Sequence, residues 1–246
     1  MSENAFYQFA QNYIAPVVRR YARLNIEGAE RLPLPGEGAL IACNHSGGLW
    51  WDALCLVSGL ADRRVQFIAH HWDASVRPIK AMLDLVDCSF LDVCEEDIHA
   101  NCEVVQRLKA GDQMCIYPEE SYHSFRHRYT LFQFSPQVIR YARAANVPIV
   151  PTAVVGVEEA APVFLGFKPT EVPLHIPLHL PLILPAKVTL AFGEPVTVAE
   201  LQADLVAPVT DEALADALRQ RVAALLGQYR DCKLSDERYI ERRSWF

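Results

Sequence analysis

Residues 39–52 read ALIACNHSGGLWWD, from Ala39 to Asp52, and the rest of the predicted fold is organised around this stretch. Its apolar beginning, up to Cys43, predicts a short buried strand. The polar, glycine-rich segment Asn44–Gly48 predicts a turn. A second apolar segment follows, and an acidic residue near its start, Asp52, is typical of the first turn of a helix. His45 therefore lies at the carboxyl end of a strand, the edge where open α/β sheets bind ligands.

The spacing between His45 and Asp52 decides whether the two can form a catalytic pair. They are seven positions apart, which on a continuous helix is roughly 10 Å, too far for a hydrogen bond. The Gly47-Gly48 pair permits a positive-φ turn that folds the histidine back over the helix. Asp52 would then accept from one ring nitrogen and leave the other as a general base. In the alternative interpretation, His45 is an ordinary loop residue and Asp52 only favours the amino end of the helix.

Length and composition indicate one large domain with a sizeable core. The chain has 246 residues, of which 51% are hydrophobic, and this suits one domain or one domain with a small extension. We predict a helical extension over residues 1–24 and a single α/β domain over residues 25–246. The net charge is −7, and no long basic run offsets it, which argues against a nucleic-acid partner.

The cysteines and histidines do not predict a metal site. The seven cysteines are scattered without a CxxC pair, so zinc and thioredoxin-like functions are not indicated. No carboxylate or cysteine stands at a ligand spacing from His70-His71 or from His123 and His127. The odd cysteine count and the absence of a signal peptide favour a cytoplasmic protein. No apolar run is long enough to span a bilayer, so we expect peripheral attachment to the inner face of a membrane.

Residues 3–24 predict an amphipathic helix. Its apolar stripe consists of Phe6, Phe9, Tyr13, Val17, Tyr21 and Leu24, which step by three or four positions. Pro16 should kink the helix or divide it. Arg19, Arg20 and Arg23 add positive charge close to the aromatic residues, a composition that suits a helix lying on a membrane. The alternative is a helix that simply docks on the domain.

Short apolar strands alternate with helical segments between residues 39 and 155. The predicted strands are 39–43, 65–69, 87–93, 113–117, 148–155 and 187–192, and the predicted helices are 49–59, 78–85, 97–109, 137–145 and 210–226. The segment Pro162–Pro185 is rich in proline and predicts a loop. The alternation predicts a layered α/β domain with an amino-terminal helical extension and a carboxy-terminal helix.

Four motifs stand in order along the chain: Asn44-His45 followed by Asp52, then Tyr117-Pro118-Glu119, then Val147–Pro151, then Gly193–Val196. Together they resemble the glycerolipid acyltransferase family, typified by the lysophosphatidate (PlsC-like) acyltransferases. The resemblance covers about residues 25–200. It implies that family's layered domain with a mixed sheet.

The resemblance also implies an activity and roles for particular residues. The family transfers a fatty acyl chain from an acyl-CoA or acyl-carrier-protein thioester to a lipid hydroxyl, without a metal, a cofactor or an acyl-enzyme. His45 would deprotonate the hydroxyl, Asp52 would orient His45, and Glu119 matches the acceptor-binding block. Backbone N–H groups near Gly47 and Gly48 are candidates for stabilising the oxyanion. The expected partners are the thioester donor, the lipid acceptor and a membrane surface.

Departures from the family pattern concern the acceptor. Six residues separate His45 from Asp52 where the family usually has four, and the double glycine can absorb the difference. The block usually written Pro-Glu-Gly-Thr-Arg is here PEESY, residues 118–122, and the preceding block 90–94 lacks the family's arginine. Candidate acceptor-binding residues besides Glu119 are Ser121, Arg126 and Arg128. If the two arginines bind phosphate, the acceptor is a lysophospholipid, which we favour. Otherwise it is neutral, such as mono- or diacylglycerol.

Two other classes of function are alternatives to acyl transfer. A serine hydrolase needs a Gly-x-Ser-x-Gly nucleophile elbow, which the chain lacks. Cys43 stands in an apolar strand, where a thiol is inert. A non-catalytic lipid-binding protein would account for the altered blocks, but the presence together of Asn44, His45, Asp52 and Glu119 argues against it.

Overall fold

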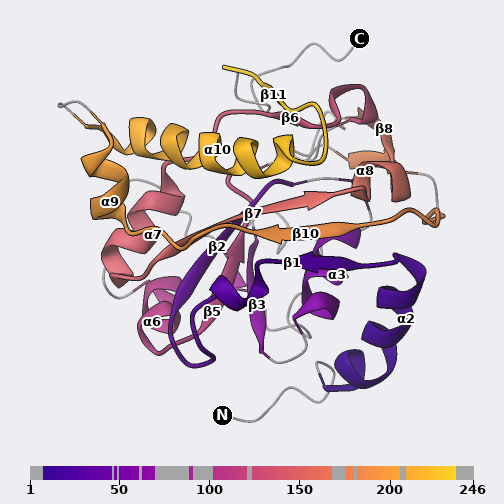
Figure 1. Ribbon diagram of the computed structural model, residues 1–246, viewed down its shortest axis with the longest axis horizontal. Helices are drawn as coiled ribbons and strands as arrows, with labels where there is room; N and C mark the ends of the chain where they lie inside the picture. The colour runs from indigo at the N-terminus through magenta and orange to yellow at the C-terminus, as the bar shows by residue number, and fades with distance from the viewer. Residues whose placement is uncertain are drawn as a thin grey trace.

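The computed structural model has a mixed central sheet with helices on both of its faces (Figure 1). It describes residues 8–45, 47–48, 50–60, 63–69, 89–90, 102–120, 124–167, 176–179, 182–205 and 209–236. The predicted layered α/β class is confirmed.

The main sheet has, in the described part of the chain, seven strands in the order β1-β10-β7-β2-β5-β3-β4. Their bounds are β1 Asn25–Glu27, β2 Ala39–Cys43, β3 Val65–Ala69, β4 Ser89–Phe90, β5 Gln113–Ile116, β7 Ile149–Val155 and β10 Thr189–Phe192. All neighbouring strands are parallel except β10 and β7, which are antiparallel, so the sheet is mixed.

The central strands β7, β2 and β5 are buried along their whole length. Continuous apolar runs such as ALIAC in β2 are typical of strands whose two faces are both covered. Ile41 in β2 lies opposite Cys115 in β5 and Val150 in β7. Because these three strands are parallel, their carboxyl ends meet at one edge of the sheet. His45 follows β2 directly at that edge.

Helices cover the two faces separately. One face carries α6 (Glu103–Lys109), α7 (Gln137–Ala145), α9 (Val198–Ala203) and α10 (Asp211–Gly227); the other carries the π-helix η1 (Ala10–Ile14), α2 (Ala15–Tyr21) and α3 (Trp51–Gly59). Figure 1 shows α10, α9, α7 and α6 together, and α2 and α3 apart from them. Side chains of a strand alternate between faces, so Leu40 packs in the first core and Ile41 in the second. Short helices η2 (Ala29–Arg31), η3 (Phe125–His127) and α8 (Val157–Ala160) lie in the connections.

The predicted helix 137–145 is confirmed at both ends. The carboxy-terminal helix, predicted over 210–226, is α10, and the hydroxyl of Thr210 caps it by accepting the N–H of Ala213 at 3.2 Å. The predicted helix 97–109 extends too far at its start: Cys102 is the N-cap with non-helical backbone and α6 begins at Glu103, while residues 97–101 lie outside the described residues. The predicted helix 78–85, and the predicted strand 87–93 apart from Ser89–Phe90, lie outside the described residues.

The prediction of a loop over Pro162–Pro185 is wrong. Strand β8 (Val163–Phe167) pairs with β9 (Ile176–His179) in an antiparallel two-stranded sheet. The apolar, aromatic sequence of β8 has high β-propensity, and proline is tolerated in β9 because an edge strand has a side without ladder hydrogen bonds. A second small sheet pairs β6 (Thr130–Leu131) with β11 (Lys233–Leu234) and was not predicted.

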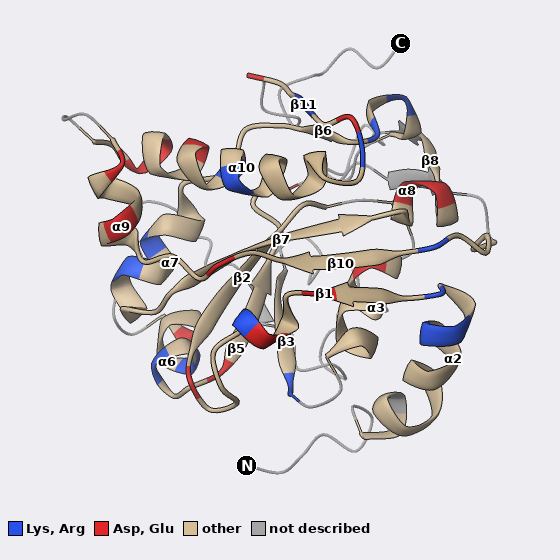
Figure 2. Ribbon diagram, viewed as in Figure 1, with Lys and Arg blue, Asp and Glu red and all other residues tan. Residues whose placement is uncertain are grey.

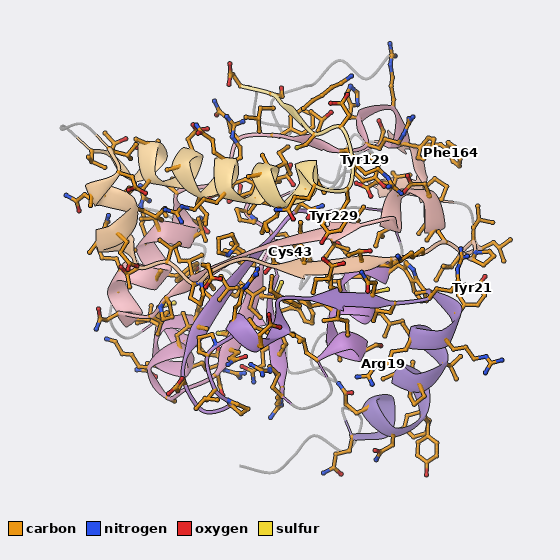
Figure 3. The ribbon with its side chains drawn as sticks, viewed as in Figure 1. Arg19, Tyr21, Cys43, Tyr129, Phe164 and Tyr229 are labelled. Atoms are coloured by element: carbon orange, nitrogen blue, oxygen red, sulfur yellow. The ribbon has the colours of Figure 1, made fainter. Side chains whose placement is uncertain are left out.

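The amino-terminal helix packs on α3 and leaves most of its predicted apolar stripe in solvent, whereas Leu24 at the end of the stripe packs against the second core. The backbone changes from the π-helix η1 to the α-helix α2 just before Pro16. Ala15, Val18 and Ala22 are buried, whereas Phe9 is 50%, Tyr13 67% and Val17 66% exposed. Figure 3 shows Tyr21, a further member of the stripe, at the outer edge of the molecule. Phe6 lies outside the described residues.

Of the three basic residues near the end of this helix, Arg23 follows α2 and donates to the carbonyl oxygen of Pro185 at 3.4 Å, and Arg19 has a structural role within the helix. Its guanidinium group donates to the carbonyl oxygens of Ser58 and Gly59, at the end of α3. A cation there satisfies helix carbonyl groups and complements the helix dipole. Grouping Arg19 with Arg20 and Arg23 as lipid-facing charges was therefore wrong. Among the described helices, none is both long and apolar enough to cross a bilayer.

Candidate active site

Asn44 anchors the loop that begins at the carboxyl end of β2. Its side-chain amide donates to the carbonyl oxygen of Val154 at 3.0 Å, and its Oδ1 accepts the N–H of Val154 at 2.7 Å. The side chain thus replaces a backbone partner for β7 where β2 ends. The motif drew attention to Asn44, but sequence reasoning did not assign it this role.

His45 and Asp52 form a buried pair. His45 Nδ1 lies 2.7 Å from Asp52 Oδ2, and the second carboxylate oxygen accepts the N–H of Ala53 at 2.8 Å. The His45 residue is 8% exposed and Asp52 1%. Polar groups so deeply buried are stable only when they are hydrogen-bonded. The geometry predicted from the glycine pair is therefore present, although the sequence spacing is seven.

The turn between the two residues explains how they meet. Gly47 has φ +70°, and a Cβ atom there would lie 2.4 Å from the side chain of Val157. Trp50, the N-cap of α3, is also left-handed. The N–H of Gly48 donates to the carbonyl oxygen of Ala161 at 2.7 Å, so this amide is occupied and the prediction of Gly48 as an oxyanion donor is corrected. The N–H of Gly47 makes no hydrogen bond with the residues described.

The carboxylate of Glu119 holds the backbone of the active-site loop. One oxygen accepts the backbone N–H of His45 at 3.2 Å, and the other accepts the backbone N–H of Phe132 at 2.8 Å. The residue is buried. A carboxylate that accepts two backbone N–H groups fixes the chain positions of both donors. The structure thus gives Glu119 a part in shaping the loop at His45, and acceptor binding by Glu119 stays a prediction.

Arg126 and Arg128 lie at the surface on and next to η3, and the structure does not bring them into the buried pair. The Arg128 guanidinium carbon lies 4.8 Å from the centroid of the Phe125 ring. Phe125 in turn contacts Phe164, which is about half exposed and is labelled in Figure 3. Ser121, the other predicted acceptor residue, lies outside the described part of the chain.

An aromatic residue beside the pair was not predicted as a site residue. The ring of Tyr117 stacks on the imidazole of His45, with centroids 4.2 Å apart and planes inclined by 25°. Its position two residues before Glu119, after a buried strand, is the sequence signal that could have found it.

Two further buried groups surround the pair. Cys43, labelled in Figure 3, is the last residue of the central strand β2. Burial raises the pKa of its thiol, so Cys43 stays protonated and is a poor nucleophile. Burial also raises the pKa of Glu158 in α8 to about 8, and the carboxylates of Glu159 and Asp52 contribute. Figure 2 shows the acidic residues of α8 in red.

No three His, Cys, Asp or Glu side chains within the described ranges gather as metal ligands would.

The fold and the site define a class: a layered α/β domain with a buried histidine–aspartate pair at the carboxyl edge of its sheet. The model of the Acyltransferase family matches residues 23–155, more than half of the chain, and the chain belongs to this family. In structure the chain is similar to the 1-acyl-sn-glycerophosphate (LPA) acyltransferase PlsC from Thermotoga maritima. The TM-score is 0.59 and the identity 17%, over 95% of this chain and 86% of that one, a likeness of fold.

Similar sequences occur in mycobacteria. The chain is 27% identical to the uncharacterized protein ML2427 of Mycobacterium leprae over 235 residues, covering 85% of this chain and 60% of that protein. It is 26% identical to the uncharacterized protein Rv0502 of Mycobacterium tuberculosis over 247 residues, covering 89% and 66%. The chain thus matches less than two thirds of the length of each of these relatives.

Proposed function

We propose that this chain transfers a fatty acyl group from an acyl thioester, either acyl-CoA or acyl-carrier protein, to a hydroxyl group of a glycerolipid. The observation that carries the proposal is the 2.7 Å contact between His45 Nδ1 and Asp52 Oδ2. When Nδ1–H donates to the carboxylate, the other ring nitrogen, Nε2, holds the lone pair and can accept a proton. Membership of the Acyltransferase family supports the same reaction.

The proposed reaction needs only this chain's residues and its two substrates. Nε2 of His45 takes the proton of the acceptor hydroxyl while the hydroxyl oxygen attacks the thioester carbonyl carbon. The N–H of Gly47 is the candidate donor to the oxyanion that forms. When the carbon–sulfur bond breaks, the imidazolium returns the proton to the leaving thiolate. The products are an ester and a free thiol, and Asp52 stabilises the imidazolium between the two steps.

His45→Ala tests the general base. The variant should lose acyl transfer, and because it also removes a hydrogen bond to the buried Asp52 carboxylate, it should be somewhat less stable than the wild type. Radiolabel from an acyl thioester should accumulate in a lipid ester with the wild type, and a thermal melt should confirm that the variant is folded. Most of the activity remaining in folded His45→Ala would refute the mechanism. Label released only as free fatty acid would indicate a hydrolase instead, and lipid binding without turnover would indicate a non-catalytic protein.

We propose a phosphate-bearing acceptor, such as a lysophospholipid, because Arg126 and Arg128 are both solvent-exposed beside the loop that follows Glu119. A charge-assisted hydrogen bond is worth about 1.5–3 kcal/mol. Arg126→Ala and Arg128→Ala should therefore each raise the KM for lysophosphatidate roughly tenfold or more. Arg221→Ala, an exposed arginine in α10 that pairs with Asp204, is the matched control and should leave KM unchanged. Unchanged KM in the loop variants, with turnover of monoacylglycerol, would favour a neutral acceptor.

We also propose that the protein attaches to the surface of an anionic membrane through the exposed stripe of its amino-terminal helix. Phe9, Tyr13 and Val17 expose half or more of their surfaces, and Arg20 on α2 is exposed as well; Figure 2 shows the basic residues of α2 in blue. Burying such a side chain contributes about 1.5–3 kcal/mol, and each basic residue near an anionic surface contributes about 1 kcal/mol. An attachment of this kind would leave the protein cytoplasmic and peripheral.

Point substitutions test this attachment better than deletion of residues 1–24, because deletion would also remove Val18 and Arg19 from their contacts with α3. The triple change of Phe9, Tyr13 and Val17 to serine should reduce sedimentation with anionic vesicles at least tenfold, and salt should weaken what remains. Leu34→Ser is the matched control, since Leu34 is 67% exposed on another part of the surface. Equal sedimentation of the triple variant and the wild type would refute the attachment.

A further inference from the structure

Tyr117 is the first residue after β5, and the register of the sheet places it beside His45. Ile41 pairs with Cys115 in the parallel ladder, so two residues further on Tyr117 lies next to Cys43. Because side chains alternate along a strand, Tyr117 and His45 share the face on which Cys43 and Cys115 pack. The two rings stack at 4.2 Å between centroids.

The hydrogen bond to Asp52 holds one nitrogen of the His45 ring but does not by itself fix the plane of the ring. An imidazole can rotate about an N–H···O axis with little loss of hydrogen-bond energy, and this rotation moves Nε2. A face-to-face neighbour removes that freedom. Tyr117 has a support of its own, because Phe67 in β3 lies nearly parallel to it, with planes 11° apart and centroids 6.3 Å apart.

We propose that Tyr117 is a positioning residue for the general base: its ring fixes the plane of the His45 imidazole and stabilises the imidazolium that forms when the acceptor gives up its proton. The inference rests on the proposed function of His45. The face of an aromatic ring attracts a cation within about 6 Å of its centroid. The neutral imidazole gains less, so the interaction strengthens toward the transition state and accelerates the reaction.

Other charged groups near His45 remain in place in the variants that test this inference. Asp52 faces the ring from α3, and Glu119 holds the backbone of His45 from the loop after β5. Glu158 in α8 interacts electrostatically with Asp52. A change seen on replacing Tyr117 alone is therefore attributable to the stacked ring.

Three variants separate the π face of Tyr117 from its volume and its hydroxyl. Tyr117→Phe keeps the stacked ring and should keep the wild-type pH profile. Tyr117→Leu keeps an apolar side chain without a π face and should lower kcat roughly 3- to 30-fold with little change in KM. The acidic limb of its kcat/KM profile should move to lower pH. Phe192→Leu is the matched control: Phe192 in β10 is buried in the same core without being part of this stack, so loss of its ring should reduce stability and leave the pH profile unchanged.

A measurement on the resting enzyme keeps the test independent of the substrate. With ¹⁵N-labelled histidine, the His45 signal is the one missing from His45→Ala, and its titration midpoint should fall by roughly 0.5–1.5 pH in Tyr117→Leu. If Tyr117→Leu does not fold, fluorinated phenylalanines at this position preserve the ring shape while weakening its negative face, and the midpoint should fall with each fluorine.

An unchanged His45 midpoint in Tyr117→Leu or in the fluorinated series would overturn the inference. So would an equal loss of kcat in Tyr117→Phe and Tyr117→Leu, because the hydroxyl would then be the important group. These failures are distinct from failure of the proposed function, which would show as acyl transfer retained by His45→Ala.

Discussion

Replacing Glu158 by glutamine should stabilise the protein at neutral and alkaline pH. This glutamate, in α8 beside the active-site loop, is 4% exposed, and its Oε2 has no hydrogen-bond partner among the described residues. Burial raises its pKa to about 8, because the charged form loses its hydration. Glutamine has the shape of the protonated acid and cannot ionise, so Glu158→Gln removes the titration with little change in packing.

The sign and size of the effect follow from proton linkage. In the unfolded chain the carboxyl loses its proton near its ordinary pKa of 4.5, whereas in the folded protein it holds the proton until about 8. Between these values the unfolded state binds fewer protons, so stability falls as pH rises. One pKa unit corresponds to 1.36 kcal/mol. The carboxyl should therefore cost about 3 kcal/mol of stability at pH 7, and on the order of 4–5 kcal/mol above pH 8.

Equilibrium unfolding in urea at several pH values measures this cost. The free energy of unfolding of Glu158→Gln should exceed that of the wild type by a margin that widens by about 3 kcal/mol between about pH 5 and pH 8. Glu159→Gln is the matched control on the same helix. Glutamine at position 159 keeps an oxygen that can accept the Tyr129 hydroxyl, 2.6 Å away in the wild type, and removes only a neighbouring charge that contributes to the raised pKa of Glu158, so the stability margin of this control should change far less with pH. A margin for Glu158→Gln that stays constant with pH would refute the reasoning.

Three further variants probe the loop around the catalytic pair. Asp52→Asn should lower the rate of acyl transfer by about two to four orders of magnitude in a steady-state assay, because the amide cannot orient and stabilise the imidazolium in the same way. Asn44→Ala leaves a buried N–H and a buried carbonyl of β7 without a partner, and urea unfolding should show a loss of about 2–4 kcal/mol. Gly47→Ala puts a Cβ atom 2.4 Å from the side chain of Val157 at φ +70°, so kcat should fall while far-UV circular dichroism stays unchanged.

The sequence alone determined the elements whose patterns are strong and local. The apolar runs of β2 and β7 predict buried strands because only a strand covered on both faces can be apolar throughout. In the helix over 137–145, apolar residues recur with a helical period, and both of its predicted ends agree with the structure. The motifs around His45 and Glu119 indicated where the chemistry lies, because these residue types follow directly after such strands.

The tertiary structure decided how those residues are arranged. The seven-residue spacing left the contact between His45 and Asp52 open, and it is the left-handed turn at Gly47, packed against Val157, that closes it. The period of the amino-terminal helix defines an apolar stripe but not the side that docks, and the small residues Ala15 and Val18 pack on α3 instead. Tyr117 meets His45 because parallel pairing brings the ends of β2 and β5 to the same edge. Such contacts join residues far apart in the chain, so they depend on strand order and register, which a local pattern does not encode.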